Sequence, residues 1–518
     1  MEVLSYDSAA RMALVLIIVQ PLVPFLPSHP ATAYYSEKIN GMSWPVARSL
    51  GEAVHVNSLQ VRGHHSMPIY RIQNFSEHHR GFTIARIVPT RHDFEMLGEF
   101  QGLGYDNVTP PDVQVAAGPS NILEMVNLEG QVWSKDGIRE GPPFSLSDFF
   151  GTGSGFISDP KVIYDGPSGR WVASLTDISS SNVLVAASTT GDAAGRFCIY
   201  NFTSSGFLIP DQPILGISSD KVSVAVNDFD PYSGQFVYSQ FWIINKSQML
   251  DCSPVSFISK TTPDYFSIHP VQNVSLEPTQ YMVSTSQNST RPEIDVFSVR
   301  GVPPGPVSVS VAREKISSDM EPPGAVQKGT NLDIDTGDTR VQDAKWQDGR
   351  LWVAFNDGCI PDGDSTLRSC VHLVSLDTHR FHVMSDFDFG IAGKYLFYPA
   401  ITEMPENRNL LVVFGYSSHY DYPGIDATVG EFHGREARLE SPETVKAGMG
   451  PVDLIYGCSL GHLCRYGDYF GASLDPLNHN LVWAAGEFGS GVEDPEGFGM
   501  GWSTEIANFT AGQEHRLP

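Results

Sequence analysis

The stretch DPKVIYDGPSGRWVASLT, residues 159–176, contains the structural unit from which the fold of this chain can be inferred. A polar residue and a proline open the unit, and a short apolar strand follows them. The turn Asp165–Gly169 then leads into a second, more apolar strand. Gly, Pro and Asp supply the backbone conformations that a tight turn needs. The unit is therefore predicted to be a β-hairpin.

Degenerate copies of this unit recur along the chain, each with a polar residue near its start and a strongly apolar second strand. Second strands such as KVSVAV (residues 221–226) and LWVAF (351–355) are almost continuously apolar. Such runs are typical of strands that are covered on both faces. The seven copies begin at Asp112, Asp159, Gln212, His269, Asp343, Tyr398 and Tyr469.

A hairpin of this kind cannot cover its own apolar faces, whereas seven four-stranded sheets in a ring cover one another and leave only short edges. We therefore predict an all-β fold, a seven-bladed β-propeller over residues 97–518. A β-sandwich does not account for seven similar hairpins, and a β-solenoid has shorter repeats of roughly 20–30 residues. A ring of six or eight blades is the remaining alternative.

The N-terminal residues resemble an export signal. Arg11 precedes the apolar run MALVLIIV (residues 12–19), and the sequence Ala31-Thr-Ala33 fits a cleavage site between small residues. We predict a signal peptide over residues 1–33, with an uncleaved N-terminal anchor as the alternative. Residues 34–96 lack the repeat and are predicted to be an irregular leader. Within it, residues 81–89 are expected to form a strand that completes the last blade beside residues 500–510.

Composition limits the possible partners and the cellular location. The chain carries 33 basic and 59 acidic residues, a formal net charge of −26. This balance argues against nucleic acid, whose phosphates need a basic surface, and against docking on an anionic membrane. No second hydrophobic stretch follows the N-terminal one, so no membrane insertion is expected beyond a possible N-terminal anchor. We predict a secreted or cell-surface protein.

Six cysteines fit an oxidising compartment. Cys359 and Cys370 flank one short loop and Cys458 and Cys464 flank another, so each pair could close a hairpin. Cys198 and Cys252 remain, and a bond between neighbouring blades is open to them. Sequons for N-linked glycans, expected on exposed loops, lie at Asn74, Asn107, Asn201, Asn245, Asn273, Asn288 and Asn508.

Several motifs resemble those of a large set of secreted microbial propeller proteins. TPPD (residues 109–112) with EMVN (124–127) is similar to the opening of that family, and DQPILGIS (211–218) to a later repeat. GDYFGASLDP (467–476) is similar to a Trp-Gly-Asp-Tyr-Ser-Gly-like motif, with Tyr466 in place of the usual Trp and Phe470 in place of the Ser. The resemblance covers about residues 97–510 and implies a propeller and secretion. It implies no reaction, because the label "sialidase-like" given to some members is an analogy of fold.

In a propeller the starts of the innermost strands surround one mouth of the central channel. We therefore expect a polar ligand-binding ring of Asp112, Asp159, Gln212, His269, Asp343, Tyr398 and Tyr469, with Asp468 adjacent. Several carboxylates around one opening could bind a cation or act as an acid–base set. The alternative is that these side chains join neighbouring blades by hydrogen bonds to the backbone.

Calcium is the ion that the sequence favours. Asp333, Asp335 and Asp338 place carboxylates around the turn residue Gly337, and hard cations prefer such oxygen ligands. The run lacks the distal glutamate of an EF-hand loop. Local turns in which the Asp side chains accept hydrogen bonds from the backbone are the alternative.

Two functions remain open. The first is a binding or scaffold module that takes a glycan or protein ligand on one propeller face. It rests on the absence of the G-x-S-x-G, H-E-x-x-H, P-loop and Rossmann motifs. The second is an extracellular, glycosidase-like hydrolase that uses carboxylates at the channel mouth. A sialidase would need an arginine cluster, for which Arg170, Arg340 and Arg465 are the candidates, each on a separate predicted blade.

Overall fold

The fold is built from antiparallel β-strands. The computed structural model describes residues 38–49, 65–66, 84–88, 94–288, 290–406, 408–433, 436–458 and 463–511. The predicted signal peptide, residues 1–33, lies outside the described residues. Within the described ranges, no helix is long and apolar enough to cross a membrane. The α-helices there are the short α2 (Leu146–Phe150) and α3 (Lys246–Leu250).

Strand pairing in the described residues divides into seven four-stranded antiparallel runs, which we call blades 1 to 7. Blades 3 and 5 share one ten-stranded sheet, because β20 (Gln272–Asn273) pairs in parallel with a strand of each. Blade 1 consists of β7 (Gln114–Ala117), β8 (Asn121–Met125), β9 (Glu129–Ser134) and β10 (Phe144–Ser145), and blade 2 of β11 (Ile157–Asp165), β12 (Arg170–Asp177), β13 (Asn182–Ser188) and β14 (Arg196–Thr203). Blade 3 consists of β15 (Ile209–Ile217), β16 (Lys221–Phe229), β17 (Phe236–Asn245) and β18 (Val255–Thr262). Blade 4 consists of β19 (His269–Pro270), β21 (Gln280–Thr285), β22 (Glu293–Arg300) and β23 (Ser308–Lys315).

The other three blades follow the same up-and-down order, except that the last one takes a strand from the N-terminal side. Blade 5 consists of β25 (Val341–Gln347), β26 (Arg350–Cys359), β27 (Arg368–Asp377) and β28 (His382–Phe389). Blade 6 consists of β29 (Tyr395–Glu403), β30 (Leu410–Ser417), β31 (Gly424–His433) and β32 (Glu436–Glu440). Blade 7 consists of β35 (Gly471–Leu474), β36 (Leu481–Glu493), β37 (Met500–Ala511) and β5 (Phe94–Gly104). The structure also contains two short parallel pairs, β3 (His65–Ser66) with β6 (Val108–Thr109) and β24 (Asp333–Ile334) with β34 (Leu463–Cys464), and the strand β33 (Glu443–Lys446) beside β31.

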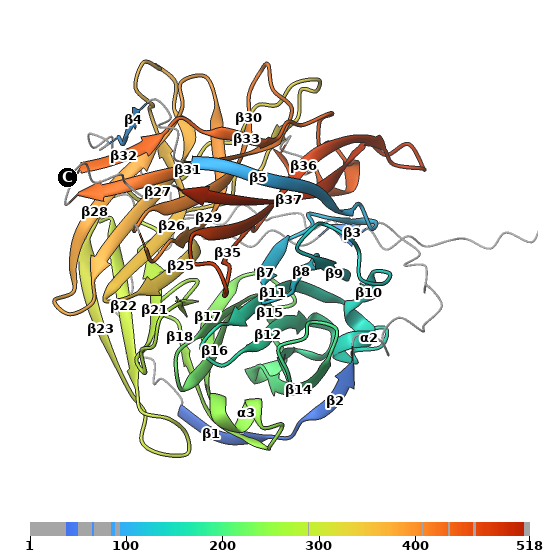
Figure 1. Ribbon diagram of the computed structural model, residues 1–518, viewed down its shortest axis with the longest axis vertical. Helices are drawn as coiled ribbons and strands as arrows, with labels where there is room; N and C mark the ends of the chain where they lie inside the picture. Colours follow the sequence, from blue (N-terminus) through green and yellow to red (C-terminus); the bar gives the residue numbers. More distant parts are fainter. Residues whose placement is uncertain are drawn as a thin grey trace, which may run out of the picture. The chain divides into compact units, whose positions relative to one another are not determined.

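The innermost strands of the blades form a closed ring. β7 lies beside β11, β11 beside β15, β15 beside β19 and β19 beside β25. β25 lies beside β29, β29 beside β35, and β35 returns to β7. Figure 1 shows the blades following one another in chain order. The predicted class, an all-β propeller, is confirmed.

The apolar core lies between the blades. Each of six clusters of buried side chains joins strands of adjacent blades: blades 1 and 2, 2 and 3, 3 and 4, 4 and 5, 5 and 6, and finally 6, 7 and 1. Trp171 of blade 2 is fully buried in this way. A Cβ atom at Gly118 of blade 1 would lie 2.3 Å from its indole ring, so only glycine permits this approach.

The closing strand of the ring differs from the prediction. β5, and not residues 81–89, pairs with β37 as the outermost strand of blade 7, as Figure 1 shows in blue beside dark red. The described part of residues 81–89 forms β4 (Arg86–Val88), which pairs in parallel with β32 of blade 6. The eleven residues of β5 match the long β37, whereas the three of β4 could not cover that edge.

The leader that was predicted to be irregular contributes strands. β1 (Lys38–Ser43) pairs with β18 of blade 3, and β2 (Val46–Ser49) pairs with β14 of blade 2. Each of these two blades therefore carries a fifth, outer strand (Figure 1). Backbone pairing, for which any side chain suffices, explains why the repeat pattern did not reveal these strands.

All six cysteines are paired. The bonds Cys359–Cys370 and Cys458–Cys464 close the two loops as predicted. The third bond joins Cys198 in β14 of blade 2 to Cys252, just before β18 of blade 3. It therefore links neighbouring blades, which was the arrangement left open to this pair. The pattern fits an oxidising compartment.

Glu124 in β8 joins blade 1 to the closing strand. Its buried carboxylate accepts hydrogen bonds from the Leu103 amide of β5 at 3.2 Å, from Trp133 Nε1 at 3.0 Å and from the Thr504 hydroxyl of β37. One side chain thus bonds both strands of the closing pair. Replacing Glu124 by alanine removes the carboxylate and introduces no larger side chain.

We expect Glu124→Ala to weaken the closure of the ring, because three buried donors lose their acceptor. An unsatisfied buried donor costs about 1–3 kcal/mol, so the loss of stability should be about 3 kcal/mol or more. The urea midpoint, followed by tryptophan fluorescence, measures it. Asp136→Ala, at an exposed turn of the same blade, is the control and should leave the midpoint in place. Equal midpoints for the two variants would contradict the closing role of Glu124.

Candidate functional site

The starts of the inner strands carry an unusual backbone. In β11, β15 and β29 the register shifts at the dipeptides Asp159-Pro, Gln212-Pro and Tyr398-Pro. The residue before each proline has a positive φ, of 57°, 56° and 52°, and Asp112 and Asp468 share this conformation at 54° and 52°. Few residues other than glycine adopt it, and Asp is among the more tolerant. The conformation persists only when surrounding bonds hold it.

Asparagines supply many of those bonds. Asn127 Oδ1 accepts the amide N–H of Asp159 at 2.8 Å, and Asn356 Oδ1 accepts that of Tyr398 at 2.7 Å. Asn227 Oδ1 accepts the amide N–H of Ser267 at 2.8 Å. Each asparagine lies in, or just after, the second strand of one blade and holds the start of the next blade. The motifs EMVN, VAVN and VAFN of the sequence carry this signal, although the asparagines were not among the predicted site residues.

Five of the predicted ring residues form two groups of hydrogen bonds at this mouth. The Asp159 carboxylate accepts hydrogen bonds from the Gln212 amide at 3.0 Å and from the Tyr469 hydroxyl at 3.3 Å. Tyr398 donates its hydroxyl to the Asp335 carbonyl at 3.0 Å and contacts Asp468 Oδ1 at 3.4 Å. The side chains therefore join blades to one another, which was the alternative to ligand binding.

Two carboxyl groups at this mouth resist ionisation, that of the buried Asp112 and that of the partly exposed Asp211. Burial, with the charge of Asp159 adding to it, raises the pKa of Asp112 well above its usual range. The same two causes raise the pKa of Asp211, which the sequence analysis did not select. Asp112 accepts a hydrogen bond from Asn127 Nδ2 at 2.7 Å. Carboxyls with raised pKa values can serve catalysis, and they also occur in structural networks.

Arginines pair with two further carboxylates near this mouth. Arg340 donates to both oxygens of Asp338, at 2.7 Å and 2.6 Å, and to Gln212 Oε1 at 2.7 Å. Arg465 forms an ion pair with Asp468. Two of the three candidate arginines thus lie at the mouth, while Arg170 bonds to carbonyls of its own turn. No cluster of free guanidinium groups results from these contacts.

The predicted calcium ligands have other contacts. Asp338 holds Arg340, as described, and Asp335 Oδ1 accepts the Gly337 amide N–H at 3.0 Å in a local turn. Asp333 lies in β24, which pairs with β34. These contacts match the alternative of local turn chemistry. The guanidinium takes the place that a cation would need beside Asp338.

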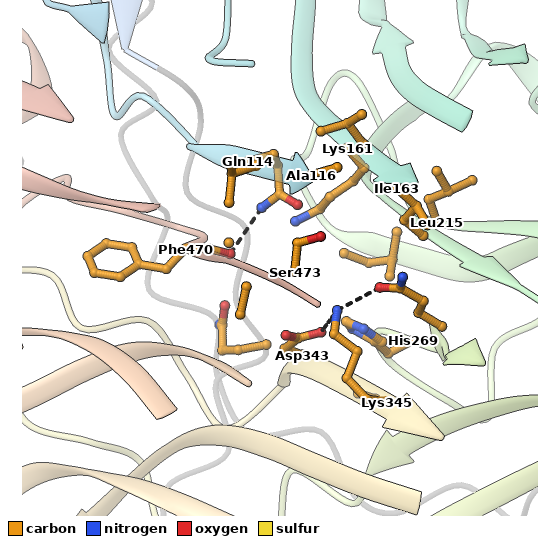
Figure 2. A pocket seen from close by; sticks show the side chains of 18 of the residues that line it. Gln114, Ala116, Lys161, Ile163, Leu215, His269, Asp343, Lys345, Phe470 and Ser473 are labelled. Atoms are coloured by element: carbon orange, nitrogen blue, oxygen red, sulfur yellow. Dashed lines mark hydrogen bonds and ion pairs between the residues drawn. The ribbon is translucent and has the colours of Figure 1, made fainter. Parts of the chain in front are cut away.

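Two of the predicted ring residues, His269 and Asp343, lie deeper in the channel. Figure 2 shows them facing Lys161, Lys345 and Gln114. The Lys345 ammonium lies 3.0 Å from Asp343 Oδ1 and 2.9 Å from Gln272 Oε1, and burial lowers the pKa of Lys161 to about 7. The pocket that these residues line has a volume of about 40 Å³, which is room for a water molecule and not for a sugar.

A larger recess lies where the inner strands end, at the opposite end of the channel. Its volume is about 250 Å³. Tyr164 and Asp165 at the end of β11, Asn273 of β20 and Thr402 of β29 line it, with His479 from the turn after β35. Asn273 Oδ1 is buried and accepts no hydrogen bond. No sequence motif indicates this recess, because its residues come from strand ends and turns that share no sequence pattern.

One buried group among the described residues could hold a metal ion. It consists of Asp357, His372 and Asp388, from three adjacent strands of blade 5. The sequence analysis did not select these residues, which are separated along the chain and follow no known ligand spacing. Only the register of the strands brings them together.

Fold and site together define a disulfide-bonded β-propeller with a polar network at the mouth where its inner strands start. No family model matches the sequence, and no curated protein is similar to it. Among solved structures, the phage phi92 endosialidase is similar at 8% identity and a TM-score of 0.37, over 78% of this chain and 67% of that one. Drosophila plexin A, in complex with semaphorin 1b, is similar at 7% identity and 0.35, over 82% and 87%. A GH43 β-1,3-galactosidase is similar at 11% identity and 0.30, over 66% and 97%.

We expect Asp112→Asn to stabilise the protein at pH 8 and to have little effect near pH 4. Because the folded-state pKa of Asp112 is raised, its contribution to stability is full below the ordinary Asp range and is lost as pH rises. The amide stays neutral and can still accept the bond from Asn127. Urea midpoints of both proteins from pH 4 to pH 8 measure the difference. A variant that is less stable by the same amount at every pH would contradict a neutral Asp112.

Proposed function

We propose that this protein is a secreted binding propeller that takes the terminal residue of a glycan in the recess at the end of its inner strands. The observation that carries the proposal is the contrast between the two ends of the channel. The side chains at the starting end hold the blades together, and the pocket at His269 and Asp343 has room only for water. The recess of about 250 Å³ approaches the ~300 Å³ at which small-molecule sites begin.

The lining of the recess suits a sugar. Asn273 Oδ1 is an acceptor without a donor, and a hydroxyl group would satisfy it. Tyr164 offers an aromatic ring, and His479 is exposed at the rim. Asn273 is also a sequon, yet its Nδ2 donates to two carbonyls and its side chain is buried, so ligand contact suits it better than glycosylation.

An extracellular hydrolase is the second candidate. It rests on Asp112, Asp159 and Asp211, because burial, and after it the charge of Asp159, raises the pKa values of Asp112 and Asp211. Asp112, however, accepts a hydrogen bond from Asn127, and Asp159 accepts one from the backbone of the next blade. These bonds support a structural role for both carboxyl groups. We rank binding above turnover for this reason.

The proposal also includes two expectations from the sequence, namely secretion and membership of a known propeller family. Secretion is supported by three disulfides, and membership of the secreted microbial propeller family rests on the motifs of the sequence. Calcium at Asp333, Asp335 and Asp338 is not included, because Arg340 already neutralises Asp338. A protein ligand on the same face is the alternative to a glycan.

We expect Gly166→Trp to abolish glycan binding without unfolding the protein. Gly166 lines the recess, is exposed and has open space where a Cβ atom would stand, so the indole would fill the opening. Gly98→Trp on β5, also exposed, is the matched control and should bind like the wild type. A glycan array followed by titration of the retained glycan measures the loss.

Two outcomes would overturn parts of the proposal. Equal binding by both tryptophan variants would move the site away from the recess. Turnover of a glycosidase-panel substrate by the wild type, lost in Asp159→Asn, would establish the hydrolase instead.

A further inference from the structure

A cluster of ionisable side chains lies inside blade 5, away from the channel and the recess. His372 of β27 pairs directly across the sheet with Asp388 of β28. On its other side it pairs with Phe355 of β26, and Asp357 follows two residues later on the same face. Asp357, His372 and Asp388 are all 0% exposed. Strand register therefore holds one imidazole and two carboxylates together in the interior.

The cluster carries more negative than positive charge. Asp386 adds a third carboxylate at the side of His372, and no lysine or arginine of the described residues forms an ion pair with any of the three. The Oδ2 atoms of Asp357 and Asp388 accept no hydrogen bond. Buried carboxylates without a cation are costly, because the interior cannot solvate their charge. Among the described residues, His372 is the one group in contact with these carboxylates that could carry a positive charge, and a single charge does not balance three carboxylates.

The spacing of the ligand atoms fits a small ion. His372 Nδ1 lies 2.7 Å from Asp388 Oδ1 and 3.3 Å from Asp357 Oδ2, and the three ligand atoms lie within 4.8 Å of one another. Ligands about 2.1 Å from one metal ion, at adjacent positions, are about 3.0–3.4 Å apart. The separation of 3.3 Å lies inside this range, and the separation of 2.7 Å lies about 0.3 Å below it.

The surrounding groups orient these ligands. If Nδ1 faces an ion, Nε2 carries the proton and donates to Asp386 at 2.9 Å, which in turn accepts the Ser317 hydroxyl at 2.7 Å. Asp357 Oδ1 accepts the amide N–H of Gly358 at 2.9 Å, which leaves Oδ2 to face the imidazole. Such outer hydrogen bonds are the usual support of metal-bound histidine and carboxylate.

We propose that Asp357, His372 and Asp388 bind one divalent transition-metal ion, zinc or manganese, and that this ion has a structural role in blade 5. The imidazole ligand favours these ions over calcium, which takes oxygen ligands. Complete burial leaves no open position for a substrate, so the ion fastens β26, β27 and β28 to one another. Metal binding of this kind stabilises the folded state, because the unfolded chain does not preform the site.

Metal analysis of the whole secreted chain tests this proposal. Protein purified without added metal should contain about one equivalent of zinc or manganese, measured by plasma mass spectrometry. Asp388→Asn should lose most of it. Asp377→Asn, which removes the carboxylate beside the exposed His382 of the same blade, is the matched control and should keep it.

Stability measurements on the wild type decide the matter even if the Asp388 variant does not fold. Chelator should lower the melting temperature, and zinc or manganese alone should restore it. A wild type that contains no metal and whose melting temperature responds neither to chelator nor to these ions would overturn the proposal. A doubly protonated His372 would then supply the missing positive charge.

Discussion

Each blade of this protein has two apolar faces, and nothing within the blade can cover either of them. The buried side chains accordingly form clusters between blades, and none of the six clusters belongs to one blade alone. Burial of this kind supplies most of the stabilising free energy of a fold. It can be completed only if the last blade meets the first. The strand β5, which precedes blade 1 in the chain, achieves this by pairing with β37.

Closure of the ring has consequences for chemistry. Seven inner strands must start around one narrow mouth, and several of them do so with a residue at positive φ. Those residues need hydrogen bonds from the preceding blade, which Asn127, Asn227 and Asn356 provide. Polar side chains at this mouth are therefore largely occupied in holding blades together. At the opposite end of the channel, the side chains do not have to hold strand starts at positive φ, and the larger recess lies there.

Local patterns predicted much of this arrangement, and the reasons are specific. Asp159, Gln212 and Tyr398 were identified because each precedes a proline at the start of a hairpin, and hairpins are encoded locally. His269 was chosen by the same rule, but in blade 4 the positive φ falls two residues earlier, at Ser267. Asp343 likewise follows the irregular position of β25, which lies between Val341 and Asp343.

Features that depend on distant pairing could not be predicted in the same way. β5 has mixed burial along its length, so its side chains show no repeat, and its role comes from backbone pairing with a strand near the other end of the chain. The cluster around His372 depends on the register of three strands. The calcium prediction used spacing in one loop and could not anticipate that Arg340 would turn back on Asp338.

An acidic chain that buries many carboxylates has to compensate each of them, and this protein does so in distinct ways. Asp338 has an arginine partner, and Asp112 retains its proton because burial raises its pKa. Glu487 combines a raised pKa with a hydrogen bond from the Gly467 amide at 2.6 Å. Each of these solutions uses what the chain itself or the solvent provides. Asp357 and Asp388 share one imidazole and have two oxygens without a donor, and for this reason we propose a bound cation there in the role that arginine or a proton has elsewhere.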